Sequence, residues 1–101
     1  MARTRSQKQS IIEKLFKRDG FKCSICKYRI QEGPGSHYLL RSSIDHVVPT
    51  SKGGTNGLYN LALTHKVCNS LKSSEELTEE LTQKCRERVR ELERTVVKTC
   101  W

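Results

Sequence analysis

The amino-acid sequence predicts a single small domain of the α+β class, with two short strands enclosed between helices. Three observations lead to this prediction. The chain has 101 residues, of which 35% are hydrophobic and 30% charged, so only a small core is expected. Two β-forming stretches flank a glycine-containing loop, with helix-forming stretches on either side. Cysteine and histidine residues also occur in two equally spaced pairs, which indicates that a cross-link stabilises the fold in addition to apolar packing.

The N-terminal third is predicted to be a basic arm followed by a helix. Residues 1–7 are expected to be disordered. The following stretch, QSIIEKLFKRDG, ends with two basic residues before Gly20, as helix C-termini often do. The apolar face of this helix would consist of Ile11, Ile12, Leu15 and Phe16. We expect this helix to cover a small core.

The cysteine spacing predicts a structural zinc site. Five cysteines are an odd number, and in a reducing compartment they are better explained as metal ligands or thiols than as disulfides. The segments CSIC and HKVC each place two donors three residues apart, which suits tetrahedral zinc. The four predicted ligands are Cys23, Cys26, His65 and Cys68. Metal binding would supply folding free energy that a small core lacks. Cys85 and Cys100 have no such partner, so we expect a small core residue and a free thiol.

The middle of the chain is predicted to form an antiparallel hairpin followed by a short helix. A knuckle, FKCSICKYRI, and a turn cluster, QEGPGS, come first. The stretch HYLLRSSIDHVV is rich in β-forming residues and is closed by Pro49. A loop with three glycines separates it from a second β-forming stretch, LYNLALT. The segment HKVCNSLKSS would then be a helix, with His65 and Cys68 on one face and Asn69 turned toward the hairpin.

Residues 74–98 are predicted to form a long amphipathic helix outside the 8–73 core. A possible capping box runs from Ser73 to Glu76, with acidic residues in the first turns and basic residues later. The apolar stripe would consist of Leu77, Leu81, Cys85, Val89, Leu92 and Val96. This stripe could pack on its own domain, pair with a second chain in a homodimer, or dock another protein of a larger assembly. Packing on its own domain is favoured, because a single amphipathic stripe usually faces a core.

Charge is distributed unevenly along the chain. The net charge is +8 and the isoelectric point is near 9.5, which favours a polyanionic partner such as nucleic acid over an anionic membrane surface. Residues 1–30 carry nine lysines or arginines and two acids, whereas residues 74–101 carry six and seven. No stretch is long and apolar enough to span a bilayer, and the N-terminal residues contain no secretion signal. We therefore expect an intracellular, cytoplasmic protein without a membrane partner.

Residues 14–73 resemble the HNH endonucleases of the ββα-metal fold. The resemblance rests on KRDGFKCSIC, DHVVPTSKGG and NLALTHKVCNSLK, which occur in the family's order and near its spacings. It implies a signature of Asp45 and His46 at the first strand end, Asn60 before the second strand and Asn69 on the helix. With asparagine in the third position, the chain is similar to the HNN variant. Many relatives have cysteine where this chain has His65, but imidazole is an equally acceptable zinc ligand.

The resemblance implies a role for each signature residue, and the chemistry agrees. Neutral imidazole is suited to take a proton from water near pH 7, so His46 is expected to be the general base. Carboxylate and carboxamide oxygens suit Mg²⁺ or Mn²⁺, so Asp45 and Asn69 are expected to hold a catalytic divalent ion. Asn60 is expected to orient the backbone around His46. Because neighbouring strand residues point to opposite faces, a bend before Pro49 or strand twist must bring Asp45 and His46 together.

The sequence therefore predicts a divalent-metal-dependent DNA endonuclease that nicks DNA or cuts both strands, leaving 3′-hydroxyl and 5′-phosphate ends. The candidates for phosphate contact are Arg41, Lys52, Lys66 and Lys72, whereas His37 lies outside the motif and is expected at the surface. Two alternatives stay open. The chain could be a non-catalytic zinc DNA-binding module, or a partner-dependent subunit of a restriction, homing or phage DNA-packaging machine. A bacterial or phage-infected cell is the expected setting.

Overall fold

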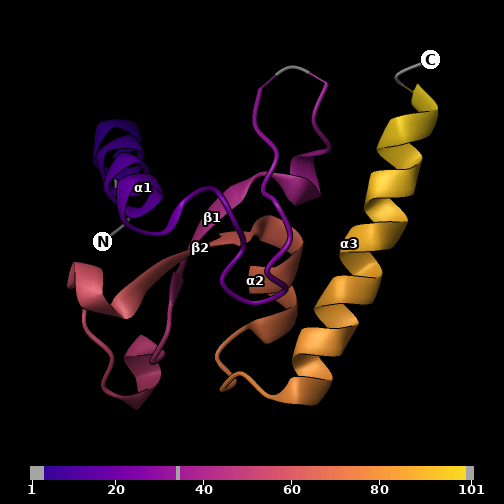
Figure 1. Ribbon diagram of the computed structural model, residues 1–101. Coiled ribbons are helices and arrows are strands. Elements are labelled where there is room, and N and C mark those ends of the chain that lie inside the picture. Colours follow the sequence, from indigo (N-terminus) through magenta and orange to yellow (C-terminus); the bar gives the residue numbers. More distant parts are fainter. Residues whose placement is uncertain (1–3, 34, 100–101) are drawn as a thin grey trace.

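The computed structural model describes residues 4–33 and 35–99, with side chains up to Arg94. Helix α1 (Arg5–Asp19) precedes strand β1 (Ser42–His46), strand β2 (Leu61–His65), helix α2 (Lys66–Lys72) and helix α3 (Glu79–Thr99). Figure 1 shows α1 and α3 on opposite sides of the hairpin, with α2 beside α3. The predicted small α+β domain is confirmed.

The two strands form the predicted antiparallel hairpin, and their register gives it two distinct ends. Ser42 is opposite His65 at one end, and His46 is opposite Leu61 at the other, where the 47–60 connection begins. All five residues of β2 are buried, so this strand lies within the core. The first strand is shorter than expected, because Tyr38–Leu40 forms a 3-10 turn capped by the His37 side chain. Nδ1 of His37 accepts a hydrogen bond from Leu39 N at 3.1 Å.

Helix α1 starts earlier than the sequence suggested. Thr4 and Gln7 form a reciprocal capping box, in which each side chain accepts a hydrogen bond from the other residue's backbone N–H. This pair satisfies backbone donors that a helix start leaves open. Residues 4–7 are therefore ordered, contrary to the expected disordered arm over residues 1–7, and residues 1–3 lie outside the described chain. On the predicted apolar face only Leu15 is fully buried, while Phe16 is 51% exposed.

Helix α3 starts later than expected and packs on its own domain. The Ser73–Glu76 capping box does not form, because Ser73 ends α2 with a positive φ of 51°. Thr78 caps α3 instead, accepting a hydrogen bond from Leu81 N at 3.1 Å. Leu77 precedes the helix and is exposed, and the side chain of Val96 lies outside the described set. The other stripe residues face the core, and three are fully buried: Cys85, Val89 and Leu92.

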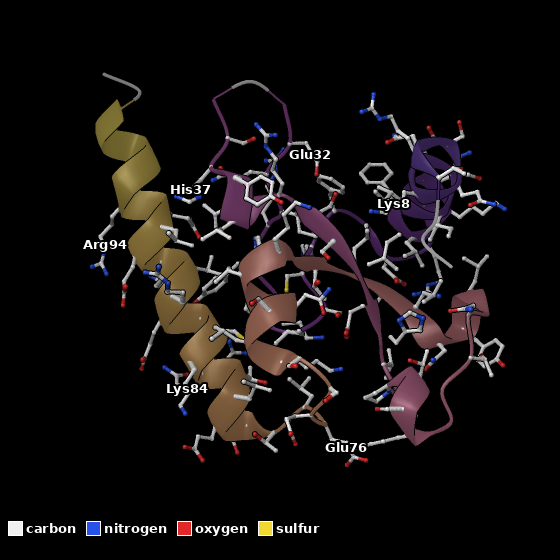
Figure 2. All side chains as sticks on the ribbon, turned by 180° about the vertical axis from the view of Figure 1, so that it is seen from behind. Lys8, Glu32, His37, Glu76, Lys84 and Arg94 are labelled. Carbon is white, nitrogen blue, oxygen red and sulfur yellow. The ribbon has the colours of Figure 1, made fainter. Side chains whose placement is uncertain are left out.

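One buried cluster joins the two helical layers through the hairpin. Its members come from α1, the knuckle, β2, α2 and α3, and cysteine side chains form its middle. The outer face of α3 is charged, and Figure 2 shows Lys84 and Arg94 projecting away from the domain. No helix in the described part of the chain combines the length and apolar character needed to cross a membrane. The main members of the core are Leu15, Ile25, Ile30, Leu40, Leu61, Leu63, Val67, Val89 and the four cysteines Cys23, Cys26, Cys68 and Cys85.

Candidate functional site

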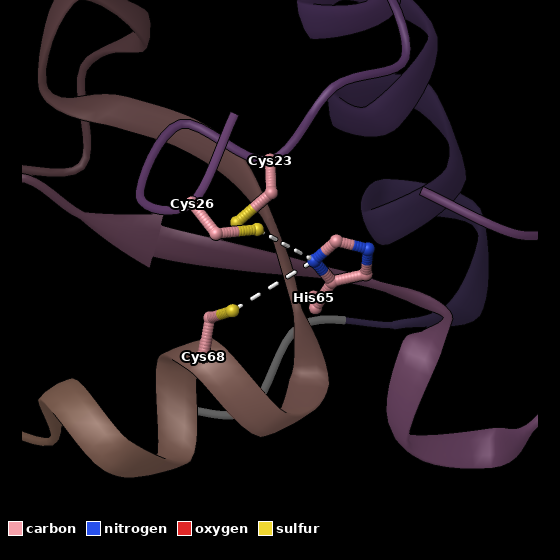
Figure 3. A group of neighbouring side chains, drawn as sticks. All are labelled: Cys23, Cys26, His65 and Cys68. Carbon is pink, nitrogen blue, oxygen red and sulfur yellow. Dashed lines mark hydrogen bonds between the residues drawn. The ribbon is translucent and has the colours of Figure 1, made fainter. Parts of the chain in front are cut away.

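The four predicted zinc ligands converge on one point. The ligand atoms of Cys23, Cys26, His65 and Cys68 all lie within 4.8 Å of one another, and all four residues are buried. Figure 3 shows the two knuckle cysteines facing His65 at the end of β2 and Cys68 in the first turn of α2. His65 was expected on the helix but is the last residue of β2. Three thiols and one imidazole form a donor set that suits tetrahedral zinc, so this group could hold the ion.

A backbone carbonyl orients the imidazole of this group. His65 Nε2 lies 2.9 Å from the carbonyl oxygen of Arg29, which can only accept, so Nε2 carries the hydrogen. Nδ1 faces the thiols, at 3.4 Å from Cys26 Sγ and 3.7 Å from Cys68 Sγ, so the neutral imidazole would present its Nδ1 lone pair to an ion bound there. Metal-binding histidines commonly have their other ring nitrogen fixed in this way. Sequence reasoning missed Arg29, because a backbone carbonyl leaves no signal in side-chain spacing.

The protonation of the metal-free group also favours a cation. Hydrogen bonds from Cys26 and Cys68 lower the pKa of the Cys23 thiol far below its ordinary value. Burial opposes a proton on His65, but contacts with Cys23 and Cys26 outweigh it and raise the histidine pKa to about 10. The donors therefore share protons among themselves when no metal is bound. A divalent ion would replace these shared protons with one central charge.

The knuckle is fixed to both neighbouring layers by hydrogen bonds. Ser24 N donates to Leu63 O of β2 at 2.8 Å, which sets the height of the cysteines above the sheet. From the other side, Arg86 Nε of α3 donates to Cys26 O at 3.3 Å. Cys85 is completely buried, with its thiol 3.9 Å from Cys68 O, but it is not one of the four converging ligands. Cys85 therefore packs behind the four-ligand group.

The opposite end of the hairpin carries the signature residues around a cleft. Asp45 and His46 end β1, and both border a cleft with a volume of about 330 Å³. Asn69 of α2 lines the same cleft. The chain bends at residues 47–48, directly after the strand, so adjacent strand residues share one cavity. The remaining lining residues are Ile44, Pro49, Thr50, Ser51, Ser73 and Ser74.

One ring nitrogen of His46 is fixed by a residue that the sequence did not single out. His46 Nε2 lies 2.7 Å from Asn56 Oδ1. Because a carboxamide oxygen can only accept, Nε2 carries the hydrogen and Nδ1 is left with a free lone pair. Asn56 stands in the loop sequence TNG, which looks like ordinary turn chemistry. Its role depends on a contact ten residues away in sequence.

Asn60 is buried and braces the backbone that follows His46. Its Oδ1 accepts from Val48 N at 2.9 Å, and its Nδ2 donates to Val48 O at 3.1 Å and Thr55 O at 2.8 Å. Its own carbonyl accepts from Val47 N at 2.9 Å. The carboxamide thus holds both sides of the connection between the strands. Asn60 does not line the cleft, so it can act on His46 only through the backbone.

Asn69 and Asp45 each have one side-chain oxygen that makes no hydrogen bond to the described residues. Asn69 Nδ2 donates to Ser43 Oγ at 2.9 Å and to Ile44 O at 3.3 Å, which fixes the carboxamide and leaves its oxygen available. Asp45 Oδ1 contacts Lys72 Nζ at 3.3 Å, whereas Oδ2 makes no hydrogen bond within the described part of the chain. Burial raises the pKa of the Asp45 carboxyl, and the Lys72 ammonium counteracts part of this rise. Two such oxygens are hard donors that fit Mg²⁺ or Mn²⁺.

Two of the four candidate phosphate contacts lie at the zinc end of the hairpin. Lys66 N donates to Arg41 O at 2.9 Å, so these residues are neighbours beside the first strand pair. The Lys66 ammonium stacks 5.0 Å from the centre of the Tyr38 ring, and Arg41 Nε donates to Ser36 Oγ at 3.0 Å. His46 lies at the other end of β1, about 13 Å along the strand from Ser42. Neither cation is among the residues that line the cleft.

The other two candidates differ from each other. Lys52 is exposed at the end of the 3-10 turn Thr50–Lys52, and the two residues before it, Thr50 and Ser51, line the cleft. Lys72 was expected to face phosphate as well. Its side chain is instead 2% exposed and directed at Asp45. Within the described structure Lys72 is therefore an internal cation.

Comparison with known proteins agrees with this arrangement. A model of the HNH endonuclease family matches residues 23–75, just over half of the chain. The match begins at the first knuckle cysteine and extends past α2, so it includes both the four-ligand group and the cleft. No curated protein and no solved structure matches the chain significantly. The resemblance predicted from the motifs is thus confirmed, and the chain belongs to the HNH endonuclease family.

Proposed function

We propose that this protein is a divalent-metal-dependent DNA endonuclease that hydrolyses phosphodiester bonds. Membership of the HNH endonuclease family suggests a nuclease. The observation that carries the proposal is the cleft itself, which brings together Asp45, His46 and Asn69 from β1 and α2. A general base and two hard oxygen donors in one cavity form a set that metal-assisted hydrolysis requires.

His46 acts as the general base through Nδ1. Asn56 holds the opposite ring nitrogen at 2.7 Å, which selects the tautomer with an open lone pair. A water in the cleft would give its proton to Nδ1 as its oxygen attacks phosphorus. The bond to the 3′ oxygen then breaks, and this oxygen takes a proton from water, which leaves a 3′-hydroxyl and a 5′-phosphate. Asn60 keeps the imidazole in place by bracing the backbone at Val48.

Asp45 and Asn69 would hold the catalytic ion through their unoccupied oxygens. When bound, a divalent ion supplies positive charge that stabilises the phosphate and the leaving oxygen in the transition state. The protein's part is to keep the two oxygens at fixed positions, and the hydrogen bonds of Asn69 to Ser43 and Ile44 do this from the helix side. Each chain has one such cleft among its described residues, so a monomer is expected to nick one strand at a time.

Zinc in the four-ligand group would have a structural role. Three thiols and an imidazole fill the four positions of a tetrahedral ion, which leaves none for water or substrate. The group ties the knuckle to β2 and α2, and thereby sets the position of Asn69, one residue after Cys68. Removing zinc would stop cleavage by unfolding the domain, so the two metals must be tested separately.

DNA binding would rely mainly on charge. The net charge of +8 favours association with a polyanion, and Lys52 supplies a cation beside the cleft. Contacts of this kind read the phosphate backbone rather than the bases, so binding should weaken steeply with salt and show little sequence preference. Arg41 and Lys66 would contact the duplex beyond the cleaved phosphate, at the other end of the hairpin.

A non-catalytic DNA-binding module is the second candidate, and one observation favours it. The Lys72 ammonium already neutralises Asp45, at 3.3 Å from Oδ1. If the ammonium took the place of the ion, the same scaffold would dock on DNA without cutting it. The unoccupied oxygens of Asp45 and Asn69 favour the catalytic function over this alternative.

The test is nicking of a supercoiled plasmid by zinc-loaded protein with and without added Mg²⁺ or Mn²⁺. The proposal predicts open circles only when the second ion is added, and DNA ligase should reseal them because the ends are 3′-hydroxyl and 5′-phosphate. Gel-shift binding is measured on the same samples. Salt-sensitive binding with intact supercoils at every ion concentration would instead support the docking module.

A further inference from the structure

Lys72, the last residue of α2, has an unusual location for a lysine. Among the described residues it is the largest side chain that is completely buried. Its ammonium lies 3.3 Å from Asp45 Oδ1 and 3.1 Å from the carbonyl oxygen of His46. Lysine is almost never fully buried unless it is paired, because removing its charge from water is unfavourable. A buried cation with two such acceptors indicates a specific role at the end of β1.

Both acceptors belong to the residues of the proposed reaction. One is the carboxylate expected to hold the divalent ion, and the other is the backbone of the general base. Lys72 engages only Oδ1 of Asp45. No buried side-chain oxygen or nitrogen in the described part of the chain lacks a partner, so Oδ2, which makes no hydrogen bond there, has exposed surface, and Asp45 lines the cleft. The ammonium therefore fixes which carboxylate oxygen faces the cleft and where β1 ends.

We propose that Lys72 is a positioning residue that holds Asp45 and His46 together and keeps the affinity for the divalent ion low. This inference rests on the proposed function. The ammonium and the ion would share one carboxylate, with like charges on its two sides. A unit charge about 6 Å from a divalent ion weakens ion binding about tenfold even at the dielectric constant of water. The protein thus loses ion affinity and gains a fixed geometry for attack.

The test compares Lys72→Met, which keeps the length and apolar stem, with Lys72→Arg, which keeps the charge. Mn²⁺ binding to zinc-loaded protein is measured by electron paramagnetic resonance, and nicking is measured at saturating Mn²⁺. Lys72→Met should bind Mn²⁺ about tenfold more tightly and yet cleave at least about tenfold more slowly. Lys72→Arg should keep the weak ion affinity of the wild type. Lost packing alone does not produce tighter ion binding.

Unchanged or weaker Mn²⁺ affinity in Lys72→Met would overturn the inference, and so would an unchanged cleavage rate. If Lys72→Met does not fold, Lys72→Gln is judged by the same criteria, because its amide can still donate to the His46 carbonyl without carrying charge. Asp45→Asn separates this inference from the proposed function. Mn²⁺ binding that does not depend on Asp45 would overturn both, whereas Asp45-dependent binding that ignores Lys72 would overturn only the role of the lysine.

Discussion

Loss of one zinc ligand should strongly destabilise the domain, and Cys68→Ser is the substitution that shows it best. Cys68 has no exposed surface and lies where α2 joins the metal centre. Serine removes the soft donor and keeps nearly the same volume. The change therefore tests the metal bond rather than the packing. We expect the variant to purify without zinc and to melt at a much lower temperature than the wild type.

The size of the effect can be worked out from the chain that zinc closes. Cys26 and His65 are 39 positions apart, and cross-linking a loop of about 40 residues removes roughly 4 kcal/mol of unfolded-state entropy. A small domain has a net stability of only about 5–15 kcal/mol. At about 4–8 °C per kcal/mol for a domain of this size, the loss lowers the melting temperature by roughly 15–30 °C.

The assay is a thermal melt followed by circular dichroism, with bound zinc quantified on the same samples. Cys85→Ala is the matched control, since Cys85 is equally buried but is not one of the four converging ligands. The control should keep one zinc per chain and lose roughly 1 kcal/mol, as an average core truncation does. A Cys68→Ser protein that contains no zinc and melts within about 5 °C of the wild type would refute the claim that zinc stabilises the fold.

Three further substitutions test the connection between the strands. Asn56→Ala should slow nicking roughly tenfold to a hundredfold at unchanged melting temperature, because it frees the half-buried ring of His46 and removes only an exposed side chain. Asn60→Ala should lower the free energy of unfolding by about 2–3 kcal/mol in urea titrations, because it leaves the Val48 backbone groups without partners. Gly54→Ala should reduce both stability and nicking, since a Cβ there would lie 1.8 Å from Val48 O; an unchanged urea midpoint would contradict this packing.

The features that depend on local spacing could be predicted from the sequence. The zinc ligands occur as two pairs three residues apart, and β-forming residues on both sides of a glycine loop specify a hairpin. The signature residues could be assigned because their order matches the family. The buried part of the C-terminal stripe was also predictable, because Cys85, Val89 and Leu92 follow helical periodicity wherever the helix begins.

The features that depend on tertiary contacts could not be predicted in the same way. Lys72 in a basic sequence looks like a surface cation, and only the approach of α2 to β1 places its ammonium beside Asp45. Asn56 looks like a turn residue, because its contact with His46 depends on how the loop folds back. The start of α3 was misplaced since Ser73 and Thr78 are both good caps, and the positive φ of Ser73 decides between them.

The most direct test of the catalytic account is the single-turnover nicking rate of two matched variants, His46→Asn and His37→Asn. Both are zinc-loaded and assayed with saturating Mg²⁺ on supercoiled plasmid. Asparagine at 37 can still cap the following turn, whereas asparagine at 46 cannot accept the proton from water. The account predicts a loss of at least about a hundredfold for His46→Asn and a near-wild-type rate for His37→Asn. Equal rates for the wild type and folded, zinc-containing His46→Asn would contradict it.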